Sequence, residues 1–428
     1  MHSLKCHHQE KIELEIKLKI YQLPEFISDY EFNKINCMQI YLDNSATTKP
    51  RSEAIAAAQT VLSHQWGNPS SLHGWGQRAA TVLETARMQV AQLLNAVNPK
   101  SIVFTSGGTE ADNLAILGVA RLYRTPQHLI ISDVEHSAIN EPAKLLEQWG
   151  WRVTRLPVGR CGRVNPLDLQ ASLQPNTVLV SVIYGQSEVG TIQPIEKLAA
   201  ITKEHGALFH TDAVQVAGRL PIDTEQLGVD LLSLSSHKIY GIQGAGALYI
   251  REGVELVPLL GGGGQEAKIR SGTQALPAIA ALGVAAKLAA QEMQTEVFRQ
   301  IKLRDRLFDL MAEYPCLETT GDRIYRLPHH VSFILSDRFT RQAPDVTGKT
   351  IVRQLNQAGI AISAGSACHS GKLTPSPILS AMGYDAAAAK RGIRLTIGKD
   401  TSEADIDWTV MVLKQVICRL MPSLVCCG

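Results

Sequence analysis

Residues 208–241 read LFHTDAVQVAGRLPIDTEQLGVDLLSLSSHKIYG and carry the clearest indication of the fold class. Two short apolar runs, at 208–210 and 231–234, are each followed at once by polar residues. The first run leads to Asp212, and the second leads to the segment that ends in Lys238. Short buried strands separated by helical sequence are typical of a parallel sheet, and ligands bind at the carboxyl ends of its strands. The stretch therefore predicts an α/β fold with a site at one edge of the sheet.

The same pattern continues on both sides of this stretch. The helical spacing of apolar residues predicts a helix over residues 75–95. Further short apolar runs, each compatible with a buried strand, lie at 102–105, 129–132, 178–183 and 247–250. Strands that alternate with helices predict a mostly parallel sheet that is covered on both faces. We therefore expect a large α/β domain over residues 38–290.

The C-terminal residues 291–428 predict a second, smaller α/β domain. Their pattern indicates a long helix, a strand, a helix and a strand, at 291–314, 331–335, 350–358 and 360–363. Residues 1–37 differ from both domains, because residues 12–20 alternate apolar with charged side chains and no partner strand lies nearby. Met38 directly precedes the well-patterned sequence, so residues 1–37 are interpreted as a leader that is disordered or not native.

The composition narrows the class of protein. The 428 residues are 45% hydrophobic and 19% charged, with a formal net charge of +2, which is typical of a globular protein with a large core. This balance gives no reason to expect nucleic acid or a membrane as a partner. The apolar run at 275–290 is too short and too rich in alanine for a membrane span. The 8 cysteines form no zinc-like spacing, so we expect reduced thiols, a cytoplasmic location and no permanent metal.

Two polar residues that follow neighbouring strands suggest a cofactor. Alone, Lys238 would more often be a solvated loop cation, and Asp212 would equally well cap a helix. Together they match the needs of pyridoxal phosphate, which takes a lysine for a Schiff base and a carboxylate for its pyridine nitrogen. Gly108 and Thr109 stand between a strand and a helix, where a phosphate could bind, although a plain helix cap would look the same. His136 follows another strand and could stack on a flat ring, although a core or surface histidine is commoner.

Ten sequence motifs occur in one order across residues 41–398. They read YLDNSATTKP, FTSGGTEADNLAI, EHSAI, EVGTIQPI, HTDAVQ, SSHKIYG, GGGGQE, RSGT, SAGSACHSG and IRLTIG. In this combination the chain resembles the cysteine desulfurases, which are fold type I pyridoxal-phosphate enzymes of the class V aminotransferase group. The resemblance covers nearly the whole chain except residues 1–37. It implies that the large domain binds the cofactor and that the smaller domain carries a mobile cysteine loop.

The resemblance implies a role for each residue that matches a family motif. Lys238 would hold the cofactor covalently, Asp212 would pair with its pyridine nitrogen, and Gln215 would bond its ring hydroxyl. His136 would stack on the ring and, with Lys238, carry protons as a catalytic residue. The phosphate would be held by Gly108, Thr109, Ser235, Ser236 and His237.

Three further residues would complete the site. Thr273, in RSGT, would reach the phosphate of a partner subunit, which implies a homodimer. Arg394, in IRLTIG, would clamp the carboxylate of the substrate L-cysteine, a task that suits a guanidinium fork. Cys368 would accept the sulfur as a persulfide and could bind an iron–sulfur species transiently. A free cysteine is more often a small buried hydrophobe, but the glycines and serines around Cys368 indicate a loop.

One position departs from the family pattern. Gln186 and Ser187 stand where the family usually has two asparagines, the second of which contacts the ring hydroxyl and the substrate carboxylate. Ser187 is shorter and would reach both groups only through water, unless Gln186 has taken over the contact.

The form of the cysteine loop resembles the subgroup that serves iron–sulfur cluster assembly. The expected function is conversion of L-cysteine to L-alanine, with sulfur passed through Cys368 to an iron–sulfur scaffold or another acceptor protein. A selenocysteine or cystine lyase on the same scaffold is the nearest alternative. A non-catalytic protein that binds a sulfur carrier is a more distant one, because it would have no need for the complete set of Lys238, Asp212, Cys368 and Arg394.

Overall fold

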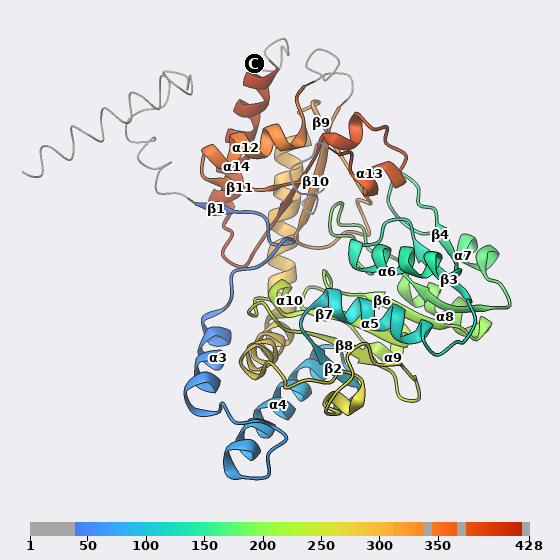
Figure 1. Cartoon of the computed structure of the whole chain (residues 1–428). Helices are drawn as coiled ribbons and strands as arrows, with labels where there is room; N and C mark the ends of the chain where they lie inside the picture. The colour runs from blue at the N-terminus through green and yellow to red at the C-terminus, as the bar shows by residue number, and fades with distance from the viewer. Residues whose placement is uncertain (1–38, 313, 337–344, 366–373, 422–428) are drawn as a thin grey trace, which may run out of the picture.

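The computed structural model describes residues 39–312, 314–336, 345–365 and 374–421 (Figure 1). The predicted leader at 1–37 and the predicted sulfur acceptor Cys368 lie outside the described residues. The described residues form a large unit and a small unit, and each unit is built around its own β-sheet, as Figure 1 shows.

The large unit is built on a seven-stranded sheet with the strand order β2-β8-β7-β6-β5-β3-β4. The pairs from β7 to β4 are parallel, and β8 runs antiparallel to both of its neighbours. The expected mostly parallel sheet is therefore confirmed. The strands are β2 (Ile102–Thr105), β3 (His128–Ser132), β4 (Arg152–Leu156), β5 (Thr177–Ser181), β6 (Leu208–Asp212), β7 (Leu231–Ser235) and β8 (Gly246–Ile250).

The sequence prediction missed strand β4 at the edge of this sheet. Its residues read RVTRL, and only Leu156 is buried, so the strand lacks the short apolar run that marks its neighbours. An edge strand pairs on one side only and needs fewer buried side chains, which is why its sequence carries a weak signal.

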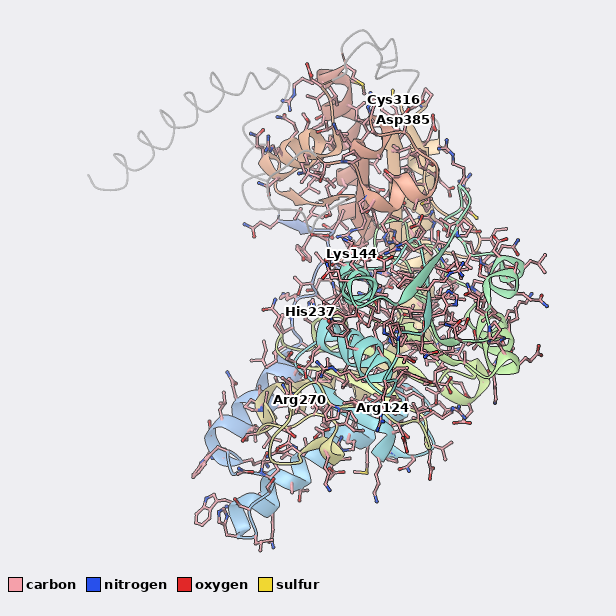
Figure 2. The ribbon with its side chains drawn as sticks, turned by 45° about the vertical axis from the view of Figure 1, so that its right-hand side comes forward. Arg124, Lys144, His237, Arg270, Cys316 and Asp385 are labelled. Carbon is pink, nitrogen blue, oxygen red and sulfur yellow. The ribbon has the colours of Figure 1, made fainter. Side chains whose placement is uncertain are left out.

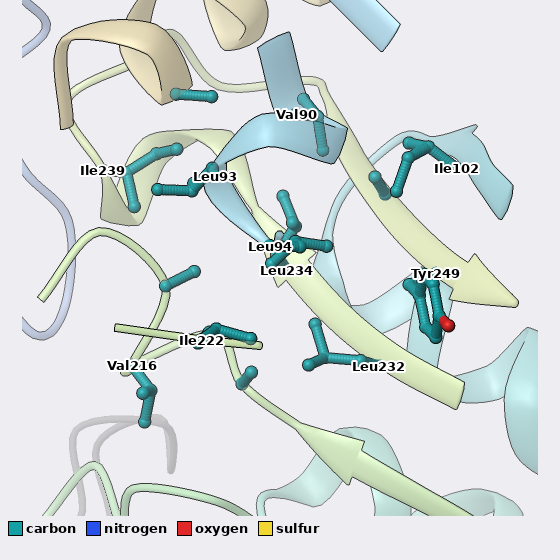
Figure 3. Close-up of a cluster of buried hydrophobic side chains, with 14 of the residues drawn as sticks. Val90, Leu93, Leu94, Ile102, Val216, Ile222, Leu232, Leu234, Ile239 and Tyr249 are labelled. Atoms are coloured by element: carbon teal, nitrogen blue, oxygen red, sulfur yellow. The ribbon is translucent and has the colours of Figure 1, made fainter. Parts of the chain in front are cut away.

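Helices cover both faces of this sheet because its central strands bury side chains on both sides. Along β2, for example, Ile102 and Phe104 join one apolar cluster and Val103 joins the other. Figure 3 shows the first cluster, which includes Leu232 and Leu234 of β7 together with Val90 of the helix at Gly74–Leu93. The helices of the large unit before its long final helix are α3 (Ser52–His64), α4 (Gly74–Leu93), α5 (Gly108–Ala120), α6 (Ser137–Gln148), α7 (Pro166–Ser172), α8 (Ile195–His205) and α9 (Thr224–Leu227). Short 3₁₀ helices lie at η1 (Pro99–Ser101), η2 (Ser236–Lys238) and η3 (Glu266–Lys268).

Helix α10 (Leu276–Ala312) connects the two units without a break. The sequence suggested a core helix at 275–290 and a separate helix from 291, but no residue between 284 and 312 is a proline or glycine that would interrupt it. By length and mean hydropathy α10 could cross a membrane, yet its N-terminal half packs against α3 and α4 inside the protein. We interpret it as a core helix. Most of its buried residues come before residue 290, and most residues after that position are at least partly exposed.

The small unit holds a four-stranded antiparallel sheet in the order β12-β13-β10-β9. Its helices pack around a separate apolar core (top of Figure 1). The strands are β9 (Leu317–Thr319), β10 (His330–Leu335), β12 (Ser363–Ala364) and β13 (Gly392–Thr396). The helices are α12 (Gly348–Gln357), α13 (Pro377–Ala381), η4 (Ala388–Lys390) and α14 (Glu403–Leu420).

The first described residues of the chain belong to this small unit. Strand β1 (Ile40–Tyr41) pairs in parallel with β11 (Ile360–Ala361), and Ile40 and Leu42 are buried in the core of the small unit. The expected single strand at 360–363 is thus two strands, with β11 facing β1 and β12 facing β13. The sequence-based division at residue 38 gave these residues to the large domain, because a pairing with a strand about 320 residues away leaves no local signal.

Candidate active site

A cavity of about 970 Å³ lies at the carboxyl ends of β3, β5, β6 and β7, with the small unit closing one side. The predicted site therefore coincides with a cavity at this edge of the sheet. Lys144 and His237, two of the lining residues, are labelled in Figure 2. The residues predicted from sequence that line the cavity are Gly108, Thr109, His136, Ser187, Asp212, Gln215, Ser235, His237, Lys238 and Arg394.

Three predicted site residues do not line this cavity. Ser236 is fully buried next to it, and its hydroxyl has no partner among the described residues. Thr273 is exposed on the segment between η3 and α10, so the chain by itself does not bring it to the site. Cys368 lies outside the described residues. The roles of all the predicted residues stay predictions, and the structure adds their arrangement.

The lysine is held by the segment that follows β1. Lys238 lies at the end of η2, and its Nζ donates hydrogen bonds to the carbonyl oxygens of Ser45 (2.5 Å) and Ala46 (2.7 Å). The neighbouring His237 contacts Thr47, with 3.1 Å between Nδ1 and Oγ1. Burial, and then the nearby ammonium of Lys238, lower the pKa of His237 to about 4, so the ring is neutral at physiological pH. Residues 45–47 thus fix the lysine and its neighbour from across the cavity.

Asp212 is buried at the end of β6. Its Oδ1 accepts a hydrogen bond from the backbone N–H of Val214 at 2.9 Å. Burial raises the pKa of Asp212, and the nearby His136, the hydrogen bond from Val214 and the ammonium of Lys238 offset part of that rise. A carboxylate in such surroundings is stabilised by any cation that enters the cavity beside it, which is what a protonated pyridine nitrogen would be.

His136 caps helix α6, and this fixes its ring. Its Nδ1 accepts a hydrogen bond from the backbone N–H of Ala138 at 3.2 Å. In the neutral ring the proton therefore lies on Nε2, which is the tautomer set by the helix cap.

Two buried acids beside Asp212 were missed by the sequence reasoning. Glu135 accepts hydrogen bonds from the hydroxyl of Ser132 and, at 2.8 Å, from the backbone N–H of Ile183. Burial raises the pKa of Glu135 to about 8. Burial, with the charge of Asp212 second, raises the pKa of Asp112 well above its usual range. Both line the cavity, and Glu135 is the neighbour of Asp212 that holds its proton near neutral pH. In the sequence, Glu135 stands next to His136 in EHSAI and Asp112 stands in TEADN, and neither position signals burial.

Arg394 forms the opposite wall of the cavity, on β13. Its Nη1 donates a hydrogen bond to the carbonyl oxygen of Ser187 at 2.9 Å, and its Nη2 donates to Oδ1 of Asp43 at 2.7 Å. Ser187 therefore meets Arg394 through its backbone. Asp43 was also missed by the sequence reasoning, although it stands in the YLDNSATT motif.

The side chain of Gln186 forms hydrogen bonds only with main-chain groups among the described residues. Its Oε1 accepts from the backbone N–H groups of Glu188 and Val189, at 2.5 and 2.9 Å, and its Nε2 donates to the carbonyl of Val134. The amide thus holds the loop that precedes Val189. Both ends of the Gln186 side chain are committed to main-chain groups, which disfavours the alternative that Gln186 takes over a contact to the ring.

The residues present fit pyridoxal phosphate. Among the described residues, the buried Oε1 of Gln215 has no hydrogen-bond partner, although its Nε2 is fixed by the carbonyl of Ser45. Helix α5 begins at the cavity without a side-chain cap, so its first N–H groups are available to a phosphate. A Cβ on Gly108 would approach Val214 to 2.7 Å, so glycine is required where the helix starts. This fold and this cavity define a fold type I pyridoxal-phosphate enzyme.

Comparisons with known proteins identify the family. The model of the aminotransferase class-V family matches residues 40–408. The chain is 41% identical over 384 residues to a protein named cysteine desulfurase IscS from Dictyoglomus turgidum, covering 89% of this chain and 95% of that protein. Among solved structures, a NifS-like protein matches with a TM-score of 0.82 and 33% identity, covering 89% of this chain and all (100%) of that one. A structure titled SspA in complex with cysteine matches with a TM-score of 0.71 and 34% identity, covering 84% and 99%.

The chain belongs to the class V aminotransferase family and, within it, to the cysteine desulfurases. It is accordingly a pyridoxal-phosphate-dependent enzyme.

Proposed function

We propose that this enzyme takes sulfur from L-cysteine onto Cys368 as a persulfide, releases L-alanine, and passes the sulfur to an acceptor protein. The observation that carries the proposal is one cavity that joins Lys238 and Asp212 to Arg394 on the opposite wall. The first two residues suit the cofactor, and the third suits the carboxylate of an amino acid. The similarity to a protein solved with cysteine supports the same substrate here.

Each residue then has a defined task. When bound, pyridoxal phosphate supplies an electron sink that allows bonds at the substrate Cα and Cβ to break. Asp212 keeps the ring nitrogen protonated, and Arg394 holds the substrate carboxylate. Lys238 Nζ moves the proton at the substrate Cα, while His136 offers the proton on its Nε2.

The thiolate of Cys368 attacks the sulfur of the substrate. A sulfur–sulfur bond forms and the carbon–sulfur bond breaks, so that cysteine and the thiol become alanine and the persulfide. Both ends of the chain segment that contains Cys368 support this role, because Gly365 before it and Pro377 after it line the cavity. A Cβ on Gly365 would collide with the carboxylate of Glu188 as that side chain now lies, so the glycine allows Glu188 to pack closely against the backbone at this wall of the cavity.

The partners and the location are part of the proposal. The acceptor would be an iron–sulfur scaffold or another sulfur carrier, as the name IscS of the relatives suggests. The enzyme would act as a cytoplasmic homodimer without a membrane. A dimer is supported by the exposed Thr273 and by large apolar side chains that face solvent, namely Trp66, Leu72 and Trp75. Figure 1 shows α3, α4 and the segment between β8 and α10 at the same end of the molecule, where a second subunit would bind.

A product assay tests the activity. The enzyme, loaded with pyridoxal phosphate, is incubated with L-cysteine and a reducing agent, and alanine and sulfide are measured together. Equal amounts of both products are expected. The same assay with selenocysteine and with cystine tests the two lyase alternatives. If kcat/KM is higher for either compound than for cysteine, that compound is the substrate.

A further inference from the structure

Arg394 is held from one side by an acidic residue that has no role in the reaction described above. Nη2 of Arg394 lies 2.7 Å from Oδ1 of Asp43, and the side chains of Arg394 and Asp43 are 6% and 21% exposed. Nη1 is bound to the carbonyl of Ser187, and among the described residues Nε has no hydrogen-bond partner. Two of the nitrogens therefore fix the guanidinium in the protein, and donors remain for a second carboxylate.

Asp43 contacts Arg394 directly, and two histidines lie close to the same part of the wall. His330 contacts the carbonyl of Ser187 at 3.1 Å, and His329 contacts the hydroxyl of Ser45 at 3.2 Å. Burial lowers the pKa of both histidines well below the usual range, so both rings are neutral near pH 7. A substrate carboxylate that reaches Arg394 would thus share the guanidinium with the carboxylate of Asp43.

We propose that Asp43 sets the affinity of Arg394 for the α-carboxylate of substrate and product. Its hydrogen bond orients the guanidinium, and its negative charge opposes that of the incoming carboxylate. The inference rests on the proposed function, in which Arg394 binds the carboxylate of cysteine. Because L-alanine carries the same carboxylate, Asp43 weakens the hold on the product as well and so speeds its release. Asp43 is a positioning residue that acts through Arg394.

The backbone around Asp43 is anchored independently of its side chain. Asp43 forms a parallel bridge with Thr396, and the next residue, Asn44, donates from its side chain to the carbonyl of Thr396 at 2.7 Å. The carbonyls of Ser45 and Ala46 hold Lys238. A change of charge at Asp43 is therefore expected to leave this segment in place. The replacement Asp43→Asn keeps the size and one acceptor oxygen for Arg394, removes the charge, and turns the other oxygen into an NH2 group.

The experiment compares the wild-type holoenzyme with Asp43→Asn by calorimetric titration with 3-mercaptopropionate. This compound has the thiol and carboxylate of cysteine but no amino group, so it tests carboxylate binding without turnover. We expect binding about tenfold tighter in Asp43→Asn, since like charges that share one partly buried cation oppose each other by an amount of this order. The KM for cysteine and the inhibition constant of L-alanine should fall in parallel, with a lower kcat because product leaves more slowly. The matched control is Asp400→Asn, which removes an exposed ion pair with Lys49 in the same part of the molecule and should change nothing.

The outcomes separate the inference from the function on which it rests. If the wild type neither binds 3-mercaptopropionate nor acts on cysteine, the proposed function fails. If the wild type does both and Asp43→Asn binds the compound equally well or more weakly, the proposal for Asp43 is overturned. The variant Asp43→Ser repeats the loss of charge with a smaller side chain and should shift binding in the same direction. Thermal unfolding and the absorption spectrum of the cofactor confirm that each variant is folded and loaded.

Discussion

The two walls of the cavity are built in different ways. The wall that faces the cofactor comes from successive strand ends of one sheet, where Asp212 ends β6 and Lys238 follows β7. The wall that faces the substrate carboxylate brings together Asp43, Ser187 and Arg394 from segments up to 351 positions apart. The residues of the first wall come from local strand–loop units, although Lys238 is also held by the carbonyls of Ser45 and Ala46. The second wall forms only where the small unit meets the large one. Each wall should therefore fail separately when it is altered.

The largest effect is expected for the cofactor wall. Lys238→Ala should lower kcat by roughly a thousandfold or more, because it removes both the covalent anchor and the proton carrier. In the wild type, borohydride reduction followed by peptide mapping should locate the cofactor on Lys238. A modified peptide elsewhere in the chain would show that the cofactor wall has been assigned to the wrong lysine.

A smaller effect is expected for the carboxylate wall. Arg394→Ala should lower kcat/KM for cysteine by roughly a hundredfold, corresponding to about 3 kcal/mol for the lost hydrogen bonds to a charged group. The dissociation constant of pyridoxal phosphate should stay unchanged, because Arg394 belongs to the other wall. A parallel loss of cofactor binding, measured by fluorescence titration, would show that the two walls do not act separately.

The buried acid beside the cofactor wall should give a pH dependence. Burial raises the pKa of Glu135 to about 8 in the folded protein, against 4.5 for the ordinary side chain. The folded state therefore holds a proton that the unfolded state releases, and this contribution to stability is complete below pH 4.5 and lost as the pH rises toward 8. Glu135→Gln should flatten the fall in unfolding free energy over this window by up to about 1.4 kcal/mol per pH unit.

Urea denaturation of the cofactor-free protein at a series of pH values measures the effect. The control is Glu141→Gln, which changes an exposed glutamate on helix α6, six residues further along the chain. Its unfolding free energy should depend on pH as that of the wild type does. An identical pH profile for the wild type and Glu135→Gln would mean that Glu135 is ionised in the folded protein.

The smallest effect concerns Ser187, where the sequence departs from its family. Ser187 meets Arg394 through its carbonyl oxygen, so an asparagine side chain would add polar groups without removing that bond. Ser187→Asn should raise kcat/KM for cysteine by about tenfold if 1.4 kcal/mol of hydrogen bonding is recovered. Gln186→Ala should mainly destabilise the loop that its amide holds. Steady-state kinetics of both variants with cysteine tests this prediction. If kcat/KM is the same in Ser187→Asn as in the wild type, the serine at this position has no catalytic consequence.

The contrast between the walls also explains what could be predicted from the sequence. Lys238, Asp212 and His136 could be predicted as cavity residues because a buried strand followed at once by a polar residue is a local signal. Arg394 was predicted from a family motif and lines the same cavity. Asp43 and strand β1 were missed because their partners, Arg394 and Ile360, are distant in the sequence.

Other features were hidden for a different physical reason. The proton held by Glu135 depends on burial, which no residue near it in the sequence reveals. The continuity of α10 across residue 290 was missed because the amino-acid composition changes there, although no proline or glycine ends the helix. Local patterns thus predict elements and the ends of strands, whereas charge states and contacts between the two units follow from packing.

The central claim is that sulfur moves from L-cysteine to Cys368. The most direct test is mass spectrometry of the alkylated and digested holoenzyme after brief exposure to L-cysteine, with Cys368→Ala measured alongside. We expect an additional sulfur atom on the peptide that contains Cys368, and neither persulfide nor sulfide from Cys368→Ala, which should still bind cysteine. Full sulfide release by Cys368→Ala, or a persulfide on the tail pair Cys426 and Cys427, would contradict the account.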